Sequence, residues 1–152
     1  MNYSDADFPN SSFDPFLVTS SQTTRYNCIA WACEDTEKWY WPDKKHMYYW
    51  PEEICRDETI ECFIDLFKRI GYRICKNDRK EFWYTKVAIY CDDKKIPTHA
   101  ARQLRNGYWT SKLGRNYDIS HTLYSMSDGY YGNVEVFMKR RRFFTPKYFK
   151  KK

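Results

Sequence analysis

The spacing of apolar residues changes at Gly71, and this change constrains the fold more than any other feature of the chain. Before Gly71, Ile60, Phe63, Ile64 and Phe67 recur at the i, i+3, i+4, i+7 spacing, which predicts an amphipathic helix. After Gly71, the period shortens to that of strands. The predicted strands are residues 84–90, 97–104, 108–112 and 133–140, with 72–75 as a weaker candidate.

Capping and turn residues mark where the elements begin and end. A first helix is expected at residues 28–36, because Asn27 offers a side-chain oxygen just before the run Cys-Ile-Ala-Trp-Ala. Asp57 is expected to cap the second helix, and Gly71 to end it in left-handed backbone. Asn106-Gly107 predicts a hairpin turn with two residues at positive φ.

These elements predict an α+β domain, with two N-terminal helices packed on an antiparallel β-meander. The length of 152 residues fits one domain, and 20% aromatic residues argue against disorder. We expect an extended lead-in at residues 1–23, the domain at 24–140 and a basic aromatic tail at 141–152. The interval between Trp41-Pro42 and Trp50-Pro51 is expected to be a loop.

The positive charge of the chain is concentrated at its end. Residues 139–152 hold eight Lys or Arg and no acid, and the remaining 18 basic residues face 20 acidic ones. Because Phe143, Phe144, Tyr148 and Phe149 interleave with these charges, the segment Lys139–Lys152 suits nucleic acid or an anionic surface. The alternative is a solvated charge run whose rings fold back on the body.

The N-terminus has no basic and apolar leader, and no apolar run is long enough to span a membrane. We therefore expect a cytoplasmic protein without a transmembrane segment, with nuclear import or signal-less export left open. The six cysteines are expected to be reduced thiols. The chain has no C-x-x-C pair, three histidines and no glycine-rich phosphate loop, so neither a metal nor a cofactor is expected.

Cys28 is the candidate reactive group because a helix start lowers the pKa of a thiol. The alternative is a small core residue. A thiolate nucleophile needs a base, and His99 is favoured because it begins a strand and has small neighbours, Ala100 and Ala101. His46 is expected to be exposed. His121 is either an orienting partner or a structural histidine.

A helix-leading cysteine, then a strand histidine, then a further polar residue resembles the papain-like cysteine hydrolases, especially their compact NlpC-type branch. The chain resembles more closely an uncharacterised family of small bacterial and viral proteins. That resemblance rests on the runs 26–32 (YNCIAWA), 98–101 (THAA), 109–114 (WTSKLG) and 118–121 (DISH).

The resemblance implies that Cys28 is the nucleophile and His99 the general base and later acid, acting on an amide, ester or isopeptide bond. The third catalytic member stays open between Ser111, His121 and Asp118. The resemblance also implies an oxyanion site at the backbone N–H of Cys28.

Candidate substrate-binding residues follow from the same motifs. They are Asn27, Trp31, Trp109 and Lys112, and Asn27 and Trp31 have helix capping and packing as alternative roles. The alternative function is a non-enzymatic module that binds nucleic acid or a protein through the tail. The oligomeric state is not predicted.

Overall fold

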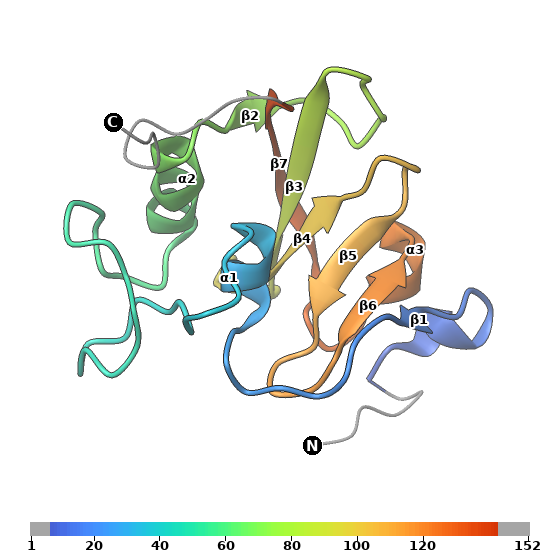
Figure 1. Cartoon of the computed structure of the whole chain (residues 1–152), viewed down its shortest axis with the longest axis horizontal. Coiled ribbons are helices and arrows are strands. Elements are labelled where there is room, and N and C mark those ends of the chain that lie inside the picture. The colour runs from blue at the N-terminus through green and yellow to red at the C-terminus, as the bar shows by residue number, and fades with distance from the viewer. Residues whose placement is uncertain (1–6, 143–152) are drawn as a thin grey trace.

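The protein is described by a computed structural model that covers residues 7–142. These residues form an α+β domain built on a seven-stranded antiparallel sheet of order β1-β6-β5-β4-β3-β7-β2 (Figure 1). The helices are η1 (Pro9–Ser12), α1 (Cys28–Ala32), α2 (Ile60–Arg69) and α3 (Leu123–Met126). The strands are β1 (Leu17–Val18), β2 (Arg73–Cys75), β3 (Tyr84–Cys91), β4 (Pro97–Gln103), β5 (Trp109–Lys112), β6 (Asp118–His121) and β7 (Asn133–Arg141).

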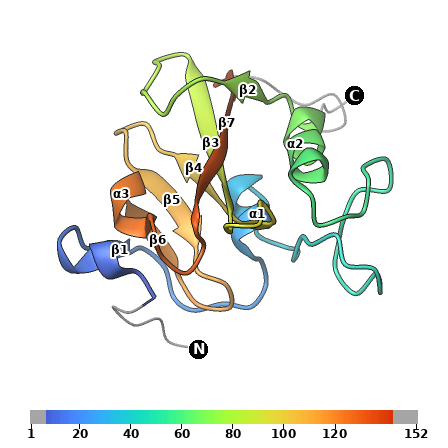
Figure 2. The same cartoon turned by 180° about the vertical axis from the view of Figure 1, so that it is seen from behind.

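Side chains alternate between the two faces of the sheet, and each face carries its own apolar core. The face covered by α1 and α2, here called the α1 face, buries Ile29, Phe63, Ile89 and Ala100 among others. The face covered by η1 and α3, here called the α3 face, buries Phe8, Tyr90, Ala101, Ile119 and Met126. Figure 1 views the sheet with α1 in front, and Figure 2 shows the same sheet from behind.

The first helix begins where predicted but ends early. The Asn27 side chain accepts a hydrogen bond from the Ala30 N–H, which confirms the cap. The helix stops at Ala32 rather than at residue 36, because Glu34 adopts left-handed backbone (φ 63°) and the Asp35 N–H turns back to the Ala30 carbonyl. No glycine marks this end, so the sequence carried no stop signal for it.

The second helix follows its predicted apolar stripe, with one correction at its start. Thr59, not Asp57, is the N-cap, and its side chain accepts from the Cys62 N–H. Gly71 ends the helix at φ 98° as predicted, and the Tyr72 N–H bonds to the Phe67 carbonyl. The Gly71 N–H also bonds to the Lys68 carbonyl, and the stop is sharp because these two bonds satisfy carbonyls of the last turn.

The predicted strands are all present within a residue or two, but four short elements were not foreseen. They are the strands β1 and β6 and the helices η1 and α3, each of which spans at most four residues. The Asn106-Gly107 prediction was half wrong. Gly107 alone has positive φ, and the Asn106 side chain instead accepts from the Tyr108 N–H.

The lead-in expected at residues 1–23 is instead part of the folded body from Asp7 onward. The Phe8 side chain is fully buried on the α3 face, and β1 pairs with β6 in the register Leu17↔Ser120. At the other end, β7 continues through Arg141. Most of the tail expected at 141–152 lies outside the described residues.

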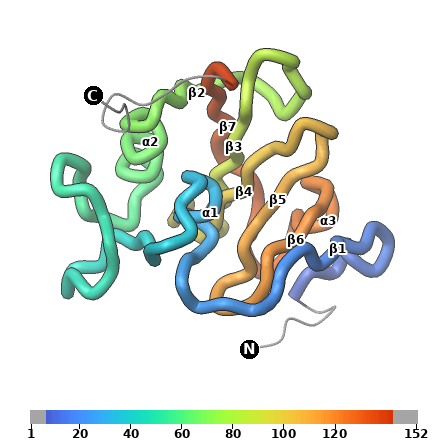
Figure 3. The backbone as a smooth tube through the Cα atoms, viewed as in Figure 1, coloured from blue at the N-terminus to red at the C-terminus, as the bar shows by residue number. Residues whose placement is uncertain are grey.

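The segment between α1 and α2 makes a long excursion beside the sheet (Figure 3). A disulfide between Cys55 and Cys62 joins this segment to α2, so the expectation of six reduced thiols is wrong for this pair. Cys28, Cys33, Cys75 and Cys91 are free thiols. Within residues 7–142, no helix is long and apolar enough to cross a membrane.

Candidate functional site

Cys28 lies at the first position of α1, where the helix packs over β4 on the α1 face. Its Sγ atom lies against the backbone N–H groups of Ala100, Ile29 and Cys28 itself, and these favour the thiolate. Burial opposes them and dominates, raising the pKa of the Cys28 thiol to about 11. Only 6% of the residue is exposed, so Cys28 is a protonated thiol at neutral pH in this conformation.

Lys112 is the cation whose charge lowers the pKa of this thiol, as the smallest of the influences on it. Its side chain is fully buried, and its Nζ donates to the carbonyl oxygens of Thr23 (2.7 Å) and Gly114 (2.6 Å). Burial lowers the pKa of Lys112 to about 8, against the opposing pull of Asp118 and Cys28. Because of this lower pKa, a fraction of Lys112 is a neutral amine near pH 7, whereas an ordinary lysine is almost entirely protonated there.

Asp118 and Tyr26 complete this cluster. Asp118 lies opposite Lys112 in the register of β5 and β6. Its Oδ2 accepts a hydrogen bond from the Tyr26 hydroxyl at 2.8 Å. Burial, followed by this hydrogen bond, raises the pKa of Tyr26 to about 12. The Tyr26 ring lies 5.2 Å from the Lys112 Nζ and stacks on Trp31. We call Cys28, Lys112, Asp118 and Tyr26 the thiol cluster.

The two other candidates on α1 have mainly structural contacts. The Asn27 side chain caps α1, accepts from the Tyr40 N–H and donates to the Tyr40 carbonyl. Trp31 donates from its indole N–H to Thr110 Oγ1 at 3.0 Å. Both residues therefore hold α1 in place, and Trp31 also forms a side of the thiol cluster through Tyr26.

The segment from Thr19 to Tyr26, here called the strap, contacts Asp118 and Lys112 of the thiol cluster and was missed by sequence reasoning. The Asp118 N–H donates to Ser20 Oγ, the Thr19 N–H donates to the Asp118 carbonyl, and the Thr23 carbonyl accepts from Lys112. The Ser- and Thr-rich sequence of this segment indicated only an extended chain. What it contacts is decided by tertiary structure.

His99 lies on the α3 face, opposite to Cys28. It is fully buried, stacks on Tyr131 with ring centroids 3.9 Å apart and sits edge-on to Tyr90. Both tyrosines belong to the α3-face core, whereas Ala100, the next residue along β4, packs with Cys28 on the α1 face. Because neighbouring strand residues point to opposite faces, the expected pair of Cys28 and His99 is not formed.

Two other candidates do meet His99. Ser111 Oγ lies 2.9 Å from His99 Nε2 and 2.7 Å from His121 Nε2. His121 Nδ1 lies 2.8 Å from the Thr122 carbonyl, which can only accept, so this nitrogen carries the hydrogen. The Ser111 hydroxyl must then donate to His121 and accept from the His99 Nε2–H.

This chain of three residues, here called the relay, is neutral. Burial, and then the nearby His121, holds the pKa of His99 well below its usual range. Burial lowers the pKa of His121 to about 4, against the pull of the Thr122 carbonyl and Asp14. His99 Nδ1 has a lone pair and no hydrogen-bond partner among the described residues. Ser111 and His121, two of the three residues considered as the third catalytic member, therefore lie beside His99. All three lie on the face opposite to the thiol.

The remaining candidates lie elsewhere. Trp109 packs against Phe137 on the α3 face, with ring centroids 6.1 Å apart. The predicted substrate-binding residue therefore lies on the face opposite to Cys28. Asp118 lies opposite Lys112 and bonds to Tyr26, on the other face of the sheet from His99. His46 is exposed, as predicted, at φ 56°.

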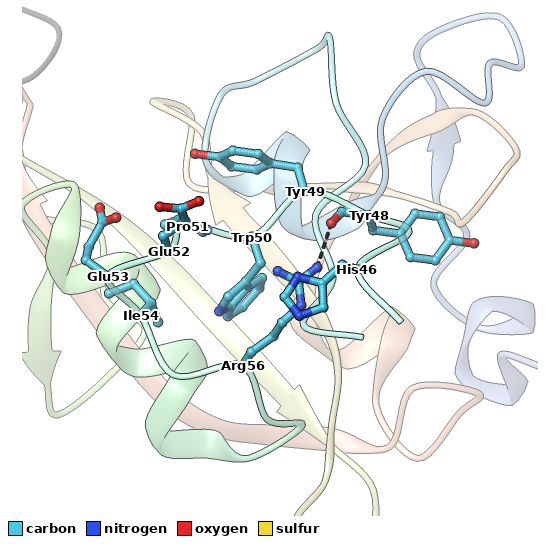
Figure 4. A pocket seen from close by; sticks show the side chains of 9 residues that line it. All are labelled: His46, Tyr48, Tyr49, Trp50, Pro51, Glu52, Glu53, Ile54 and Arg56. Atoms are coloured by element: carbon cyan, nitrogen blue, oxygen red, sulfur yellow. Dashed lines mark hydrogen bonds between the residues drawn. The ribbon is translucent and has the colours of Figure 1, made fainter. Parts of the chain in front are cut away.

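A hollow of about 760 Å³ lies beside His46 (Figure 4). Arg56 and Trp50 both line it, and Arg56 donates to the Tyr48 carbonyl at 2.8 Å. Its lining residues include neither a thiol nor an alcohol of Ser or Thr. This hollow is therefore not the candidate active site.

Comparison with known proteins gives a family without a described activity. No curated protein and no solved structure matches the chain. Residues 17–139, which hold both the thiol cluster and the relay, match a family described as "Domain of unknown function (DUF7689)". Because this match covers most of the chain, the protein belongs to the DUF7689 family.

Proposed function

We propose that the protein is a small cysteine hydrolase or acyl-transfer enzyme acting on an amide, ester or isopeptide bond. In this proposal Cys28 is the nucleophile, and Lys112 takes the place that the papain-like resemblance gave to His99. What supports it is the surroundings of the Cys28 Sγ, where backbone N–H groups and the charge of the low-pKa Lys112 both favour the thiolate. From the papain-like pattern the proposal keeps only the helix-leading cysteine ahead of an antiparallel sheet.

The proposed chemistry starts with proton transfer from the Cys28 thiol to neutral Lys112. The thiolate attacks the carbonyl carbon, the bond to the leaving group breaks, and the Lys112 ammonium returns the proton to that group. Water, or an amine in acyl transfer, then cleaves the thioester and regenerates the thiol. The proposal assigns the stabilisation of negative charge in this step to the backbone N–H groups at the start of α1.

The energy of the proton transfer is compatible with turnover. The pKa values of about 11 and about 8 make the ion pair about 4 kcal/mol less stable than the neutral pair. A turnover of about ten per second corresponds to a barrier of about 16 kcal/mol, which leaves room for this step. Substrate entry requires the strap to move, because Cys28 and Lys112 are both buried.

The proposal is tested with an activated ester, p-nitrophenyl acetate, and peptide mass mapping. We expect the acetyl thioester on Cys28 and none on Cys91. Cys91 is the matched control because it is equally buried and its pKa is also raised to about 11 by burial, but two carboxylates lie near it. Lys112→Met should slow acetylation of Cys28 about tenfold or more, whereas Lys86→Met, at another buried lysine, should not.

Equal acetylation of Cys28 and Cys91 would refute the proposal. So would a Lys112→Met variant that melts like the parent protein and acetylates Cys28 at the parent rate. If Lys112→Met does not fold, the pH profile of the parent protein decides. Acetylation of Cys28 should rise through pH 8 as Lys112 loses its proton, and a profile that follows only a thiol near pH 11 contradicts the role of Lys112.

A further inference from the structure

A second surface, remote from the thiol chemistry, is strongly basic. The connection between β2 and β3, together with β7, encloses a hollow of about 610 Å³, here called the basic hollow. Its lining holds one carboxylate, Glu81. The cations that line it are Arg73, Lys76, Arg79, Lys80, Lys86 and Lys139.

The single carboxylate leaves most of this charge uncompensated. Glu81 forms ion pairs with Lys86 at 2.8 Å and Lys139 at 3.0 Å, and its hydrogen bonds to these two lysines lower its pKa to about 2. In the described part of the chain, no carboxylate lies within salt-bridge distance of the other four cations. The hollow therefore presents a net positive charge that attracts anionic ligands.

The positive field extends past the hollow. Burial lowers the pKa of Lys80, and repulsion from Arg142, Arg105 and Lys86 lowers it further. Three chain segments that are distant in sequence thus bring cations to one place. An anion bound there would relieve this repulsion, as phosphate groups do when they meet clustered lysines and arginines.

Exposed aromatic rings lie at the edge of this field. Phe82 follows Glu81 directly and is 68% exposed, and the neighbouring Trp83 is 56% exposed. The Arg142 guanidinium lies 5.1 Å from the Phe82 ring centre, so a ring and a cation are presented together. Such pairs suit a ligand that alternates charged groups and flat rings, because phosphates meet the cations and bases stack on the rings.

We propose that the basic hollow and Phe82 form a binding site for single-stranded nucleic acid. Arg79 and Lys80 contact backbone phosphates, and the Phe82 ring stacks on an unpaired base. A duplex offers the same phosphates but no unstacked base, so the exposed ring favours the single strand. None of the residues that line the basic hollow belongs to the thiol cluster, and Arg79, Lys80 and Phe82 lie outside the segment Lys139–Lys152.

The experiment uses the full chain and a fluorescein-labelled oligothymidylate of about 15 nucleotides, within the range that such sites cover. Binding is followed by anisotropy across a series of salt concentrations. The double substitution Arg79→Glu, Lys80→Glu should weaken binding at least tenfold. It should also reduce the slope of log affinity against log salt by about 1.4, from two lost phosphate contacts.

The matched control is Lys45→Glu, Lys94→Glu, which changes the net charge equally at two exposed lysines outside the hollow. It should keep most of the affinity. Phe82→Ser should weaken binding of the single strand about tenfold and leave binding of a duplex of the same length nearly unchanged. Circular dichroism and melting confirm that each variant is folded.

Three outcomes would overturn the proposal. The first is an equal loss in the hollow variant and its control, which would mean that net charge alone attracts the oligonucleotide. The second is a loss only when Lys147, Lys150, Lys151 and Lys152 are changed to Gln, which would place binding in the tail. The third is Arg79- and Lys80-dependent binding to vesicles of phosphatidylserine and phosphatidylcholine without binding to the oligonucleotide, which would make the site a membrane contact.

Discussion

The relay of His99, Ser111 and His121 makes a defined prediction for stability between pH 7 and pH 5. Both histidines are buried and neutral, with pKa values below the usual 6.5, and that of His121 is about 4. Such a group binds its proton more readily in the unfolded chain. The stability that it contributes is therefore present above the unfolded pKa and is lost as the pH falls from about 6.5 toward the folded pKa.

The magnitude follows from the unfolded pKa of about 6.5. For each histidine that stays neutral in the folded protein, the unfolding free energy falls by about 2 kcal/mol between pH 7 and pH 5. For two histidines it falls by about 4 kcal/mol. Against a typical stability of about 5–15 kcal/mol, this change is large. The lowered pKa values of Asp43, Glu53 and Glu81 affect stability only in a more acidic range.

Urea unfolding followed by tryptophan fluorescence at pH 7, 6 and 5 measures this loss. His121→Gln should remove about half of the pH dependence, whereas His46→Gln, at an exposed position, should retain it. Nitrogen-15 NMR should show His121 protonated at Nδ1 and His99 at Nε2, as the hydrogen bonds require. A loss below about 1 kcal/mol at pH 5, or the opposite tautomers, would refute the neutral relay.

Two further predictions concern the stability of the fold outside the two sites. Reduction of the Cys55–Cys62 disulfide should lower the unfolding free energy by about 2.5 kcal/mol, as expected for so short a loop, and an unchanged urea midpoint after reduction would contradict this. Gly132→Ala should destabilise by about 3 kcal/mol, because a Cβ there would lie 2.1 Å from the Cys91 carbonyl oxygen. Gly107→Ala shares the positive φ but meets nothing within 4 Å, so it should cost only about 1–2 kcal/mol, and equal losses in calorimetry would exclude the steric explanation.

Local chemistry was enough to predict the elements whose signals lie within a few residues. The Asn27 cap, the apolar stripe of α2 and the left-handed Gly71 each depend on neighbours in the chain, and the structure confirms all three. The antiparallel strands after Gly71 follow from residue type and spacing in the same way. The early end of α1 at Glu34 escaped because no residue type there demands left-handed backbone.

The grouping of the site residues could not be predicted, because it depends on which face of the sheet each helix covers. Alternation along β4 requires His99 and Ala100 to point in opposite directions, but it does not say which of them meets α1. The packing of α1 over Ala100 put Cys28 on the face of the sheet away from His99, and the packing of α3 and Phe8 enclosed His99 with Ser111.

The sequence by itself therefore determined that this chain forms an α+β domain with a helix-leading cysteine and antiparallel strands after Gly71. Only the tertiary structure decided which of these groups share a site. The Cys55–Cys62 pair shows the same division, since a disulfide needs two Cα atoms brought close, here to 5.4 Å, and that closeness is made by the fold. Contacts between segments far apart in the chain carry no local signal, because they are selected by the packing of whole elements.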